Sequence, residues 1–250
     1  IRDDVESRGL GDVYKRQIFL YNRMKGTIWG ANGEFLSSGR LDDLQCAYGS
    51  LQGFLNADNP EHVIMHCVLD NEEVGSLTRQ GAASTFLKDV LERISESIYQ
   101  SREEYLRALA SSFMISADNA HSVHPNQAEK SDRSNRPYLN GGIVLKHSAN
   151  QKYTTDGASA AVFRALCRKA GVSCQNFTNR SDMAGGSTLG NLSNGQVSIH
   201  TVDIGLPQLA MHSPYETGGV RDTEDLIKVA ETFYCSNLKI CRDGVYCIEP

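Results

Sequence analysis

Hydrophobic side chains recur at steps of three and four along several stretches of the chain, the spacing of one face of an α-helix. The clearest case is Leu41, Leu44, Tyr48, Leu51 and Leu55, which predicts an amphipathic helix ending near Asn56. Similar patterns predict helices over Thr85–Ile98 and Glu103–Leu109. Two more helices are expected. The first is capped by Thr155 or Asp156 and runs through Ala158, Val162, Leu166 and Ala170. The second is capped by Asp222, and its inner face includes Leu226, Val229, Ala230 and Phe233.

Short apolar runs lie between these helices and are typical of buried strands. They are Val63–Leu69, Phe113–Ile115, Ile143–Lys146 and Val197–Val202, the last of which leads to Gly205 and Pro207. Strands that alternate with helices predict an α/β fold, with a layered and mostly parallel sheet flanked by helices.

The composition narrows the class of protein. The 250 residues carry a formal net charge of −5 and contain no block rich in Lys or Arg, which argues against a nucleic-acid partner. No apolar run approaches the roughly 18 residues of a membrane span, and no signal-peptide pattern is present, so we expect no membrane association. The seven cysteines are scattered without a Cys-x-x-Cys pair, which favours reduced thiols and a cytoplasmic location.

The chain divides into three segments by composition. Residues 1–17 are rich in charge and glycine, show no sustained period and resemble a translated sequencing adaptor, so we expect a non-native segment there. Residues 18–234 contain the predicted helices and strands and form one expected domain. Residues 235–250 hold three cysteines without a clear pattern, and no role is assigned to them.

Acidic and imidazole side chains gather after predicted strands and at helix starts. Glu72 and Glu73 are adjacent in the run Asp70–Ser76, directly after the predicted strand 63–69, where open α/β sheets place their sites. Asp42, Asp118 and His212 lie at positions of the same kind. Taken alone, each of these residues also has a non-catalytic explanation. The Glu pair could lie in a solvated turn, and Asp42 could be a charge in the first turn of a helix. Asp118 could stabilise a turn, and His212 could be a hydrogen-bonded histidine of the core.

Taken together, these side chains match the needs of a binuclear metal hydrolase. Such a centre uses one carboxylate to bridge two ions about 3.5–4 Å apart, further carboxylates and imidazoles as ligands, and a free carboxylate to handle protons. Ligation by oxygen and imidazole nitrogen suits Zn²⁺, with Mn²⁺ or Co²⁺ as alternatives.

Five segments, in this order along the chain, carry a more specific signal. They are Gly39–Asp43, Asp70–Ser76, Ser116–Asn126, Gly185–Gly190 and Pro207–Ser213. With them the chain resembles the aspartyl aminopeptidase family of zinc metallopeptidases, which includes the vacuolar aminopeptidase I type. The resemblance extends from about Gly39 to Tyr234 and implies removal of N-terminal residues from a peptide substrate, with two zinc ions in the complete enzyme.

The resemblance also implies a role for individual residues. Asp42 resembles the ligand that bridges the two ions, and Glu72 resembles the general base. Glu73 and His212 resemble ligands of one zinc, and Asp118 resembles a ligand of the other. His121, Lys146 and Tyr153 match positions that the family uses near the substrate. A lysine cation there would fit a preference for Asp or Glu at the peptide N-terminus.

One family feature has no counterpart in this sequence. The family carries an upstream His-x-Asp segment that supplies the histidine of the second zinc, and an inserted domain used in oligomer assembly. No histidine precedes His62 here. We therefore expect the catalytic domain of a co-catalytic zinc exopeptidase that is incomplete at its N-terminal side, from an enzyme that is a homo-oligomer when complete.

Two other functions remain open from the sequence. Related co-catalytic zinc enzymes, a glutamyl aminopeptidase or a deacylase, share the acidic pair but not the run Ala120–Pro125. A catalytically inactive fragment is the second alternative, because loss of a ligand weakens metal binding.

Overall fold

A four-stranded sheet in the order β3–β7–β5–β6 lies at the centre of the computed structural model, which describes residues 20–183, 185–242 and 244–249. Its strands are β3 (Phe113–Ala117), β5 (Ile143–His147), β6 (Cys174–Thr178) and β7 (His200–Gly205). β3 pairs in parallel with β7 and β5 in parallel with β6, whereas β5 and β7 are antiparallel over Val144–Gly205 and Leu145–Ile204. The predicted α/β class and mostly parallel sheet are confirmed.

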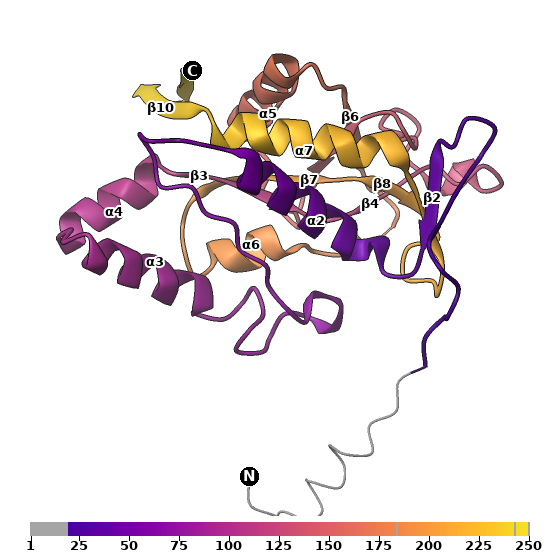
Figure 1. Ribbon diagram of the computed structural model, residues 1–250, viewed down its shortest axis with the longest axis horizontal. Helices are drawn as coiled ribbons and strands as arrows, with labels where there is room; N and C mark the ends of the chain where they lie inside the picture. The colour runs from indigo at the N-terminus through magenta and orange to yellow at the C-terminus, as the bar shows by residue number, and fades with distance from the viewer. Residues whose placement is uncertain (1–19, 184, 243, 250) are drawn as a thin grey trace, which may run out of the picture.

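Helices cover both faces of this sheet, as Figure 1 shows. One face carries α2 (Leu41–Asn56), α5 (Gly157–Ala170) and α7 (Val220–Tyr234), and the other carries the short α6 (Leu189–Asn194). Helices α3 (Phe86–Ser97) and α4 (Arg102–Ser111) lie at one end. The main core cluster is buried between the layers and includes Leu145, Phe163, Val202, Ile204 and Leu226.

Helix α2 ends at Asn56, as predicted, but most of its apolar stripe is not its buried face. Leu44, Tyr48, Leu51 and Leu55 are exposed, whereas Gly49 and Gly53 are buried. A Cβ on Gly53 would lie 2.5 Å from the Ala230 Cβ, so the glycines let α2 approach α7 closely. The small face of the helix meets its neighbour, and the large apolar face is left toward solvent.

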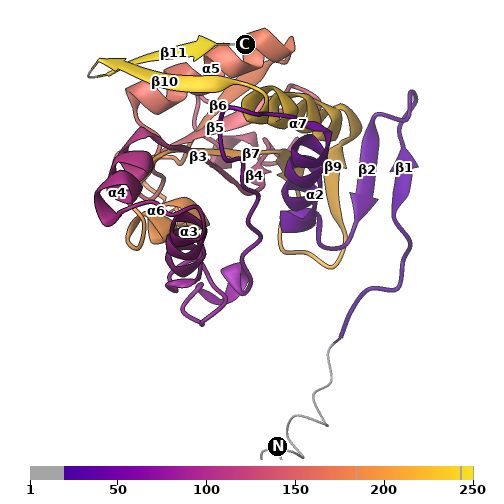
Figure 2. The same ribbon diagram turned by 60° about the vertical axis from the view of Figure 1, so that its left-hand side comes forward.

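A second sheet, in the order β1–β2–β9–β8–β4, lies beside the first and was not predicted. Its strands are β1 (Thr27–Trp29), β2 (Phe35–Ser38), β4 (Ala120–His121), β8 (Pro207–Leu209) and β9 (Glu216–Gly219). All its pairs are antiparallel except β4 with β8. The sheet brings the start of α2 to the turn between β8 and β9, as Figure 2 helps to follow.

Two helix starts show how local chemistry sets the bounds. Asp156 accepts a hydrogen bond from the Ser159 N–H and caps α5, as one of the two predicted alternatives. The cap predicted for the last helix is wrong, because α7 begins after Gly219 and Asp222 lies inside its first turn. The buried Asp222 carboxylate instead accepts hydrogen bonds from the N–H groups of Asn140 and Gly142.

The predicted strand Val63–Leu69 is not a strand in the structure. Within the described residues, none of its N–H groups donates to a backbone carbonyl. A strand needs a partner ladder, and the edge of β3 is not paired to this segment. The segment leads into the 3-10 turn η1 (Glu72–Val74); a similar turn, η2 (Ala128–Lys130), lies in the loop before β5.

The C-terminal segment forms a hairpin of β10 (Asn237–Arg242) and β11 (Val245–Glu249), closed by a disulfide between Cys241 and Cys247. The expectation of reduced thiols is therefore wrong for these two cysteines, while the other five are free. No helix in the described residues is both long and apolar enough to span a membrane. The segment 1–17, expected to be non-native, lies outside the described residues.

Candidate metal centre

Three parts of the chain converge at one edge of the central sheet. Asp42 comes from the start of α2, Glu73 from the turn η1, and His212 from the turn between β8 and β9. One ligand atom of each lies within 4.8 Å of the others. The His212 Nε2 is 3.1 Å from the Asp42 Oδ2 and 2.9 Å from the Glu73 Oε2. The structure thus brings together the three residues predicted to hold one ion.

The environment of Asp42 fits a cation. Its side chain is only 3% exposed, and its Oδ1 has no hydrogen-bond partner. Burial, followed by the charges of Asp118 and Glu73, raises the pKa of Asp42 to about 9 in the metal-free protein. A buried carboxylate among other carboxylates is stabilised by a positive ion, and the donors here are the oxygens and imidazole that Zn²⁺ accepts.

A second group of carboxylates shares Asp42. Ligand atoms of Asp42, Asp43 and Asp118 lie within 4.8 Å of one another. Asp118 was predicted as a ligand of the second ion, whereas Asp43 was not assigned a role, although its position directly after Asp42 was a signal. The Asp43 Oδ1 accepts a hydrogen bond from the Asn119 N–H at 3.1 Å, and burial, then the Asp118 charge, raises its pKa well above the ordinary value.

Glu72 lies beside the centre and makes no ion pair among the described residues. The turn that carries it starts at Asn71, which has a positive φ of 60° and whose carbonyl accepts the Ser76 N–H at 2.9 Å. Burial, followed by the charges of Asp118 and Glu73, raises the pKa of Glu72 to about 7. A carboxylate with a pKa close to neutral can both accept and return a proton. This is the property expected of the predicted general base.

Glu216 links two of the metal-site residues and was missed by the sequence reasoning. Its side chain is 2% exposed, and its carboxylate accepts the Asp42 N–H at 3.0 Å and the His212 N–H at 2.7 Å. His212 has a positive φ of 65°, which this bond helps to hold. Because Asp42 and Glu216 are far apart in the sequence, no local pattern could have identified the contact.

The three residues predicted near the substrate also lie at this edge. Lys146 is 3% exposed and its Nζ is 2.9 Å from the Asp118 Oδ2 and 5.6 Å from the centre of the Tyr153 ring. Burial alone would lower the pKa of Lys146, but Asp118 and Tyr153 raise it above its ordinary value. The pKa of His121 is lowered by partial burial of its ring and then by the charges of Lys146 and His212. All eight predicted site residues therefore surround one centre.

Comparison with known proteins agrees with this geometry. The family model "Aminopeptidase I zinc metalloprotease (M18)" matches residues 7–234. The chain is 50% identical over 223 residues to "Probable M18 family aminopeptidase 2" of Clostridium novyi (strain NT), covering 89% of this chain and 52% of the relative. A protein of the same description in Pseudomonas aeruginosa (strain UCBPP-PA14) is 42% identical over 225 residues, covering 90% and 51%.

A solved structure gives the same result for the fold. The mApe1 dodecamer of S. cerevisiae matches with a TM-score of 0.75 and 31% identity, over 86% of this chain and 49% of that chain. The chain spans about half the length of the curated relatives it matches. The family match covers most of the chain, and the chain belongs to the aminopeptidase I zinc metalloprotease (M18) family.

Proposed function

We propose that this chain is the part of a zinc-dependent aminopeptidase that holds the general base and most of the metal ligands. One observation carries the proposal: ligand atoms of Asp42, Glu73 and His212 converge within 4.8 Å. Glu72 precedes Glu73 in the chain and feels the charges of Asp118, Glu73 and His212, and its pKa is raised to about 7. The reaction is hydrolysis of the first peptide bond of a peptide substrate. Asp42 and Asp118 belong to a second ion position, so the complete enzyme holds two zinc ions.

The residues of this chain divide the work of hydrolysis. Zinc, when bound, supplies Lewis acidity that polarises the scissile carbonyl and lowers the pKa of water. Glu72 takes a proton from the attacking water at its carboxylate and returns it to the leaving amine. Glu216 holds the backbone N–H groups of Asp42 and His212, and so keeps two ligands in place.

The substrate preference assigned here is for Asp or Glu at the peptide N-terminus. Lys146 supports it, since its ammonium is buried at the edge of the centre and pairs with Asp118 in the metal-free protein. A cation bound by Asp118 would compete for this carboxylate and leave Lys146 for the acidic side chain of the substrate.

Assembly and location complete the proposal. A homo-oligomeric complete enzyme is supported by the S. cerevisiae relative solved as a dodecamer and by the exposed apolar stripe of α2. A cytoplasmic location is supported by the five free cysteines.

The test combines metal content with a panel of chromogenic aminoacyl substrates. We expect zinc-dependent cleavage of Asp and Glu substrates, loss of turnover in Glu72→Gln, and zinc content unchanged in that variant. Near-normal kcat in Glu72→Gln would refute the role of Glu72. Cleavage of acyl-amino acids alone would identify a deacylase, and zinc binding without turnover in the wild-type chain would identify an inactive fragment.

A further inference from the structure

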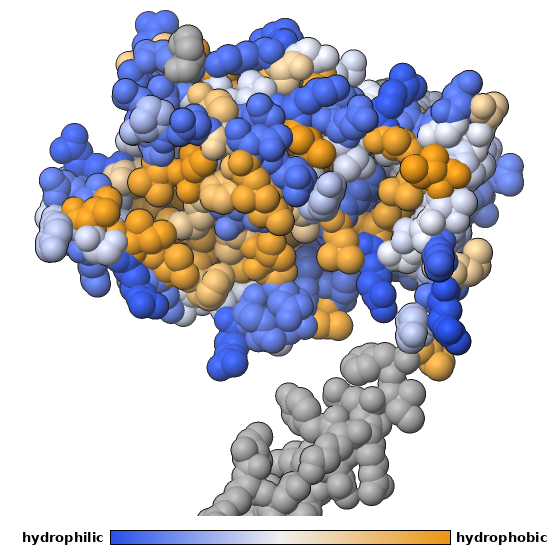
Figure 3. Space-filling model, viewed as in Figure 1, coloured by the Kyte–Doolittle hydropathy of each residue, from blue (hydrophilic) through white to orange (hydrophobic). Residues whose placement is uncertain are grey.

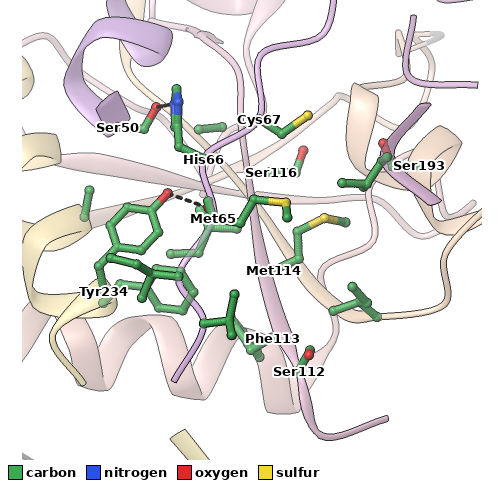
Figure 4. Close-up of a pocket in the computed structure, with 18 of the residues that line it drawn as sticks. Ser50, Met65, His66, Cys67, Ser112, Phe113, Met114, Ser116, Ser193 and Tyr234 are labelled. Atoms are coloured by element: carbon green, nitrogen blue, oxygen red, sulfur yellow. Dashed lines mark hydrogen bonds between the residues drawn. The ribbon is translucent and has the colours of Figure 1, made fainter. Parts of the chain in front are cut away.

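Five of the seven cysteines are free thiols, and their surroundings differ. Cys67 lines an apolar cavity of about 500 Å³ between the segment 63–69 and strand β3, where Figure 4 shows it together with Met65. In Figure 3 hydrophobic residues gather on the face where this segment crosses the molecule. Burial raises the pKa of Cys67, and burial followed by the charge of Asp43 raises the pKa of Cys46. Both thiols therefore stay protonated and pack as small hydrophobic side chains.

Cys167 and Cys174 are brought together by the turn between α5 and β6. Helix α5 ends in a Schellman motif, in which Gly171 has a positive φ of 69° and the Val172 N–H donates to the Cys167 carbonyl at 2.9 Å. The chain then enters β6 at Cys174, which pairs with Ile143 of β5. The side chains of the two cysteines are joined by a hydrogen bond. The local fold thus places two thiols in direct contact.

The two thiols differ in exposure. Cys167 is 1% exposed and belongs to the main core cluster, whereas Cys174 is partly exposed on β6, an edge strand of the central sheet as far as the chain is described. Cys167 also lies in the last turn of α5, where the negative end of the helix dipole disfavours a thiolate. The hydrogen bond to Cys174, then burial and the charge of Asp225 on α7, raise the pKa of Cys167. A reagent from solvent therefore meets Cys174 first, with a protonated Cys167 behind it.

Two arginines of α5 supply positive charge to Cys174. The Arg164 guanidinium donates to the Asn176 Oδ1 at 2.7 Å, and Asn176 is two residues beyond Cys174, on the same face of β6. From this position Arg164 also hydrogen-bonds the Cys174 sulfur, and Arg168 adds a second charge. The hydrogen bond from Cys167, followed by the two arginines, lowers the pKa of Cys174 to about 6, although partial burial opposes this. The thiolate of Cys174 is therefore stabilised near neutral pH.

We propose that Cys174 and Cys167 form a peroxide-reactive dithiol site, in which Cys174 is oxidised first and Cys167 then closes a disulfide between α5 and β6. Reactive cysteines are partly exposed and have positive neighbours, and Cys174 has both properties. A soft metal ion is another common ligand of paired thiols, but the charges of Arg164 and Arg168 would repel a cation here. The site is separate from the metal centre, whose predicted residues come from other elements.

The peroxide is the only oxidant that the reaction needs. The Cys174 thiolate attacks one oxygen of hydrogen peroxide, the O–O bond breaks, and the hydroxide that leaves is protonated to water. Sulfur is oxidised by two electrons to a sulfenic acid, and the peroxide is reduced. The Cys167 sulfur then attacks the Cys174 sulfur, the S–O bond breaks, and the thiol proton leaves with the hydroxyl group as a second water. Two thiols and one peroxide thus give one disulfide and two waters.

The experiment exposes the purified full chain to equimolar hydrogen peroxide with a chelator present, alkylates the remaining thiols, and maps every cysteine by peptide mass spectrometry. We expect a pair of peptides linked through Cys167 and Cys174, formed while Cys235 and Cys46 can still be alkylated. Cys235 is the internal reference, because it is exposed and would react first if access alone decided the rate. Oxidation of Cys235 before Cys174, or oxidation of Cys174 without the link to Cys167, would overturn the proposal.

Matched variants separate the roles of the residues, and circular dichroism checks that each variant folds. Cys167→Ser should accumulate a sulfenic acid at Cys174 that a dimedone probe traps, whereas Cys174→Ser should leave Cys167 reduced. Arg164→Gln should slow alkylation of Cys174 by iodoacetamide about fivefold at pH ~6, as expected for a rise of about one pKa unit. Arg102→Gln removes an exposed arginine of α4 and should leave this rate unchanged. Equal rates in the two arginine variants would contradict the proposal. The readout needs neither zinc nor turnover, so its failure is distinct from failure of the proposed function.

Discussion

Replacement of Glu216 by Gln tests whether a residue that touches no substrate sets the affinity for zinc. The wild-type carboxylate accepts two backbone N–H groups, from Asp42 at 3.0 Å and His212 at 2.7 Å, and is 2% exposed. In Glu216→Gln one oxygen becomes an NH₂ group, which cannot accept. One charge-assisted bond, typically about 1.5–3 kcal/mol, is lost, and a buried N–H group is left facing another donor.

The loss falls on the backbone of Asp42 and His212, two of the three residues proposed to hold one ion. Loss of such outer contacts typically costs about 10–100-fold in metal affinity, or roughly 1.4–2.7 kcal/mol. We expect the zinc dissociation constant of the chain, measured by competition with a chromogenic chelator, to rise by this factor. Urea unfolding of the metal-free chain should show a loss of stability as well.

Asp222→Asn is the matched control for this experiment. Asp222 is also a buried carboxylate that accepts two backbone N–H groups, from Asn140 at 2.7 Å and Gly142 at 3.1 Å, but it holds no metal ligand. It should lose a comparable amount of stability and keep its zinc affinity. A change in zinc affinity of less than about threefold in Glu216→Gln, or an equal change in both variants, would refute the role of Glu216 in holding the ligands.

Three further outcomes follow from the geometry. Burial and neighbouring carboxylates raise the pKa of Glu72 from 4.5 to about 7, so between these pH values the folded chain holds a proton that the unfolded chain has released. The free energy of unfolding of the metal-free chain should therefore fall as the pH rises through this window. Urea unfolding of Glu72→Gln with chelator present should show a weaker dependence of stability on pH. Zinc must displace the proton held by Asp42, because the pKa of this carboxyl group is raised to about 9 in the metal-free protein. Titration calorimetry at pH ~7.5 in buffers of different ionisation enthalpy should therefore detect about one proton released per zinc ion bound. Identical heats of binding in all buffers would contradict this. Gly53→Ala should lose about 1–3 kcal/mol in chemical denaturation because its Cβ would meet Ala230, whereas Gly157→Ala, with open space around it, should be neutral or slightly stabilising.

Local patterns were sufficient for most of the regular elements. The predicted helix Thr85–Ile98 is observed as Phe86–Ser97, and the strand expected over Ile143–Lys146 extends one residue further. These segments combine the right period with residues that stop or start an element, so the information lies within a few neighbours. The metal-site residues were found for a different reason, since their positions after strands and at helix starts recur in a known family.

Contacts between distant segments could not be predicted in this way. Glu216 is separated from Asp42 by more than 170 residues, and the second sheet joins β2 to β9 across a similar separation. In the short strands of this sheet, apolar and polar residues do not alternate clearly. These strands form through backbone hydrogen bonds to their neighbours and not through burial of one face. No periodicity in a single sequence reports such a pairing.

Two apolar patterns lie differently in the structure from what their spacing alone suggests. The stripe Leu44, Tyr48, Leu51 and Leu55 marks the predicted amphipathic helix, and Val63–Leu69 was predicted to be a buried strand. In the structure the stripe is exposed, and the segment 63–69 is not a strand. Hydrophobic patterns report the burial for which a sequence is adapted, whichever part of the protein covers it.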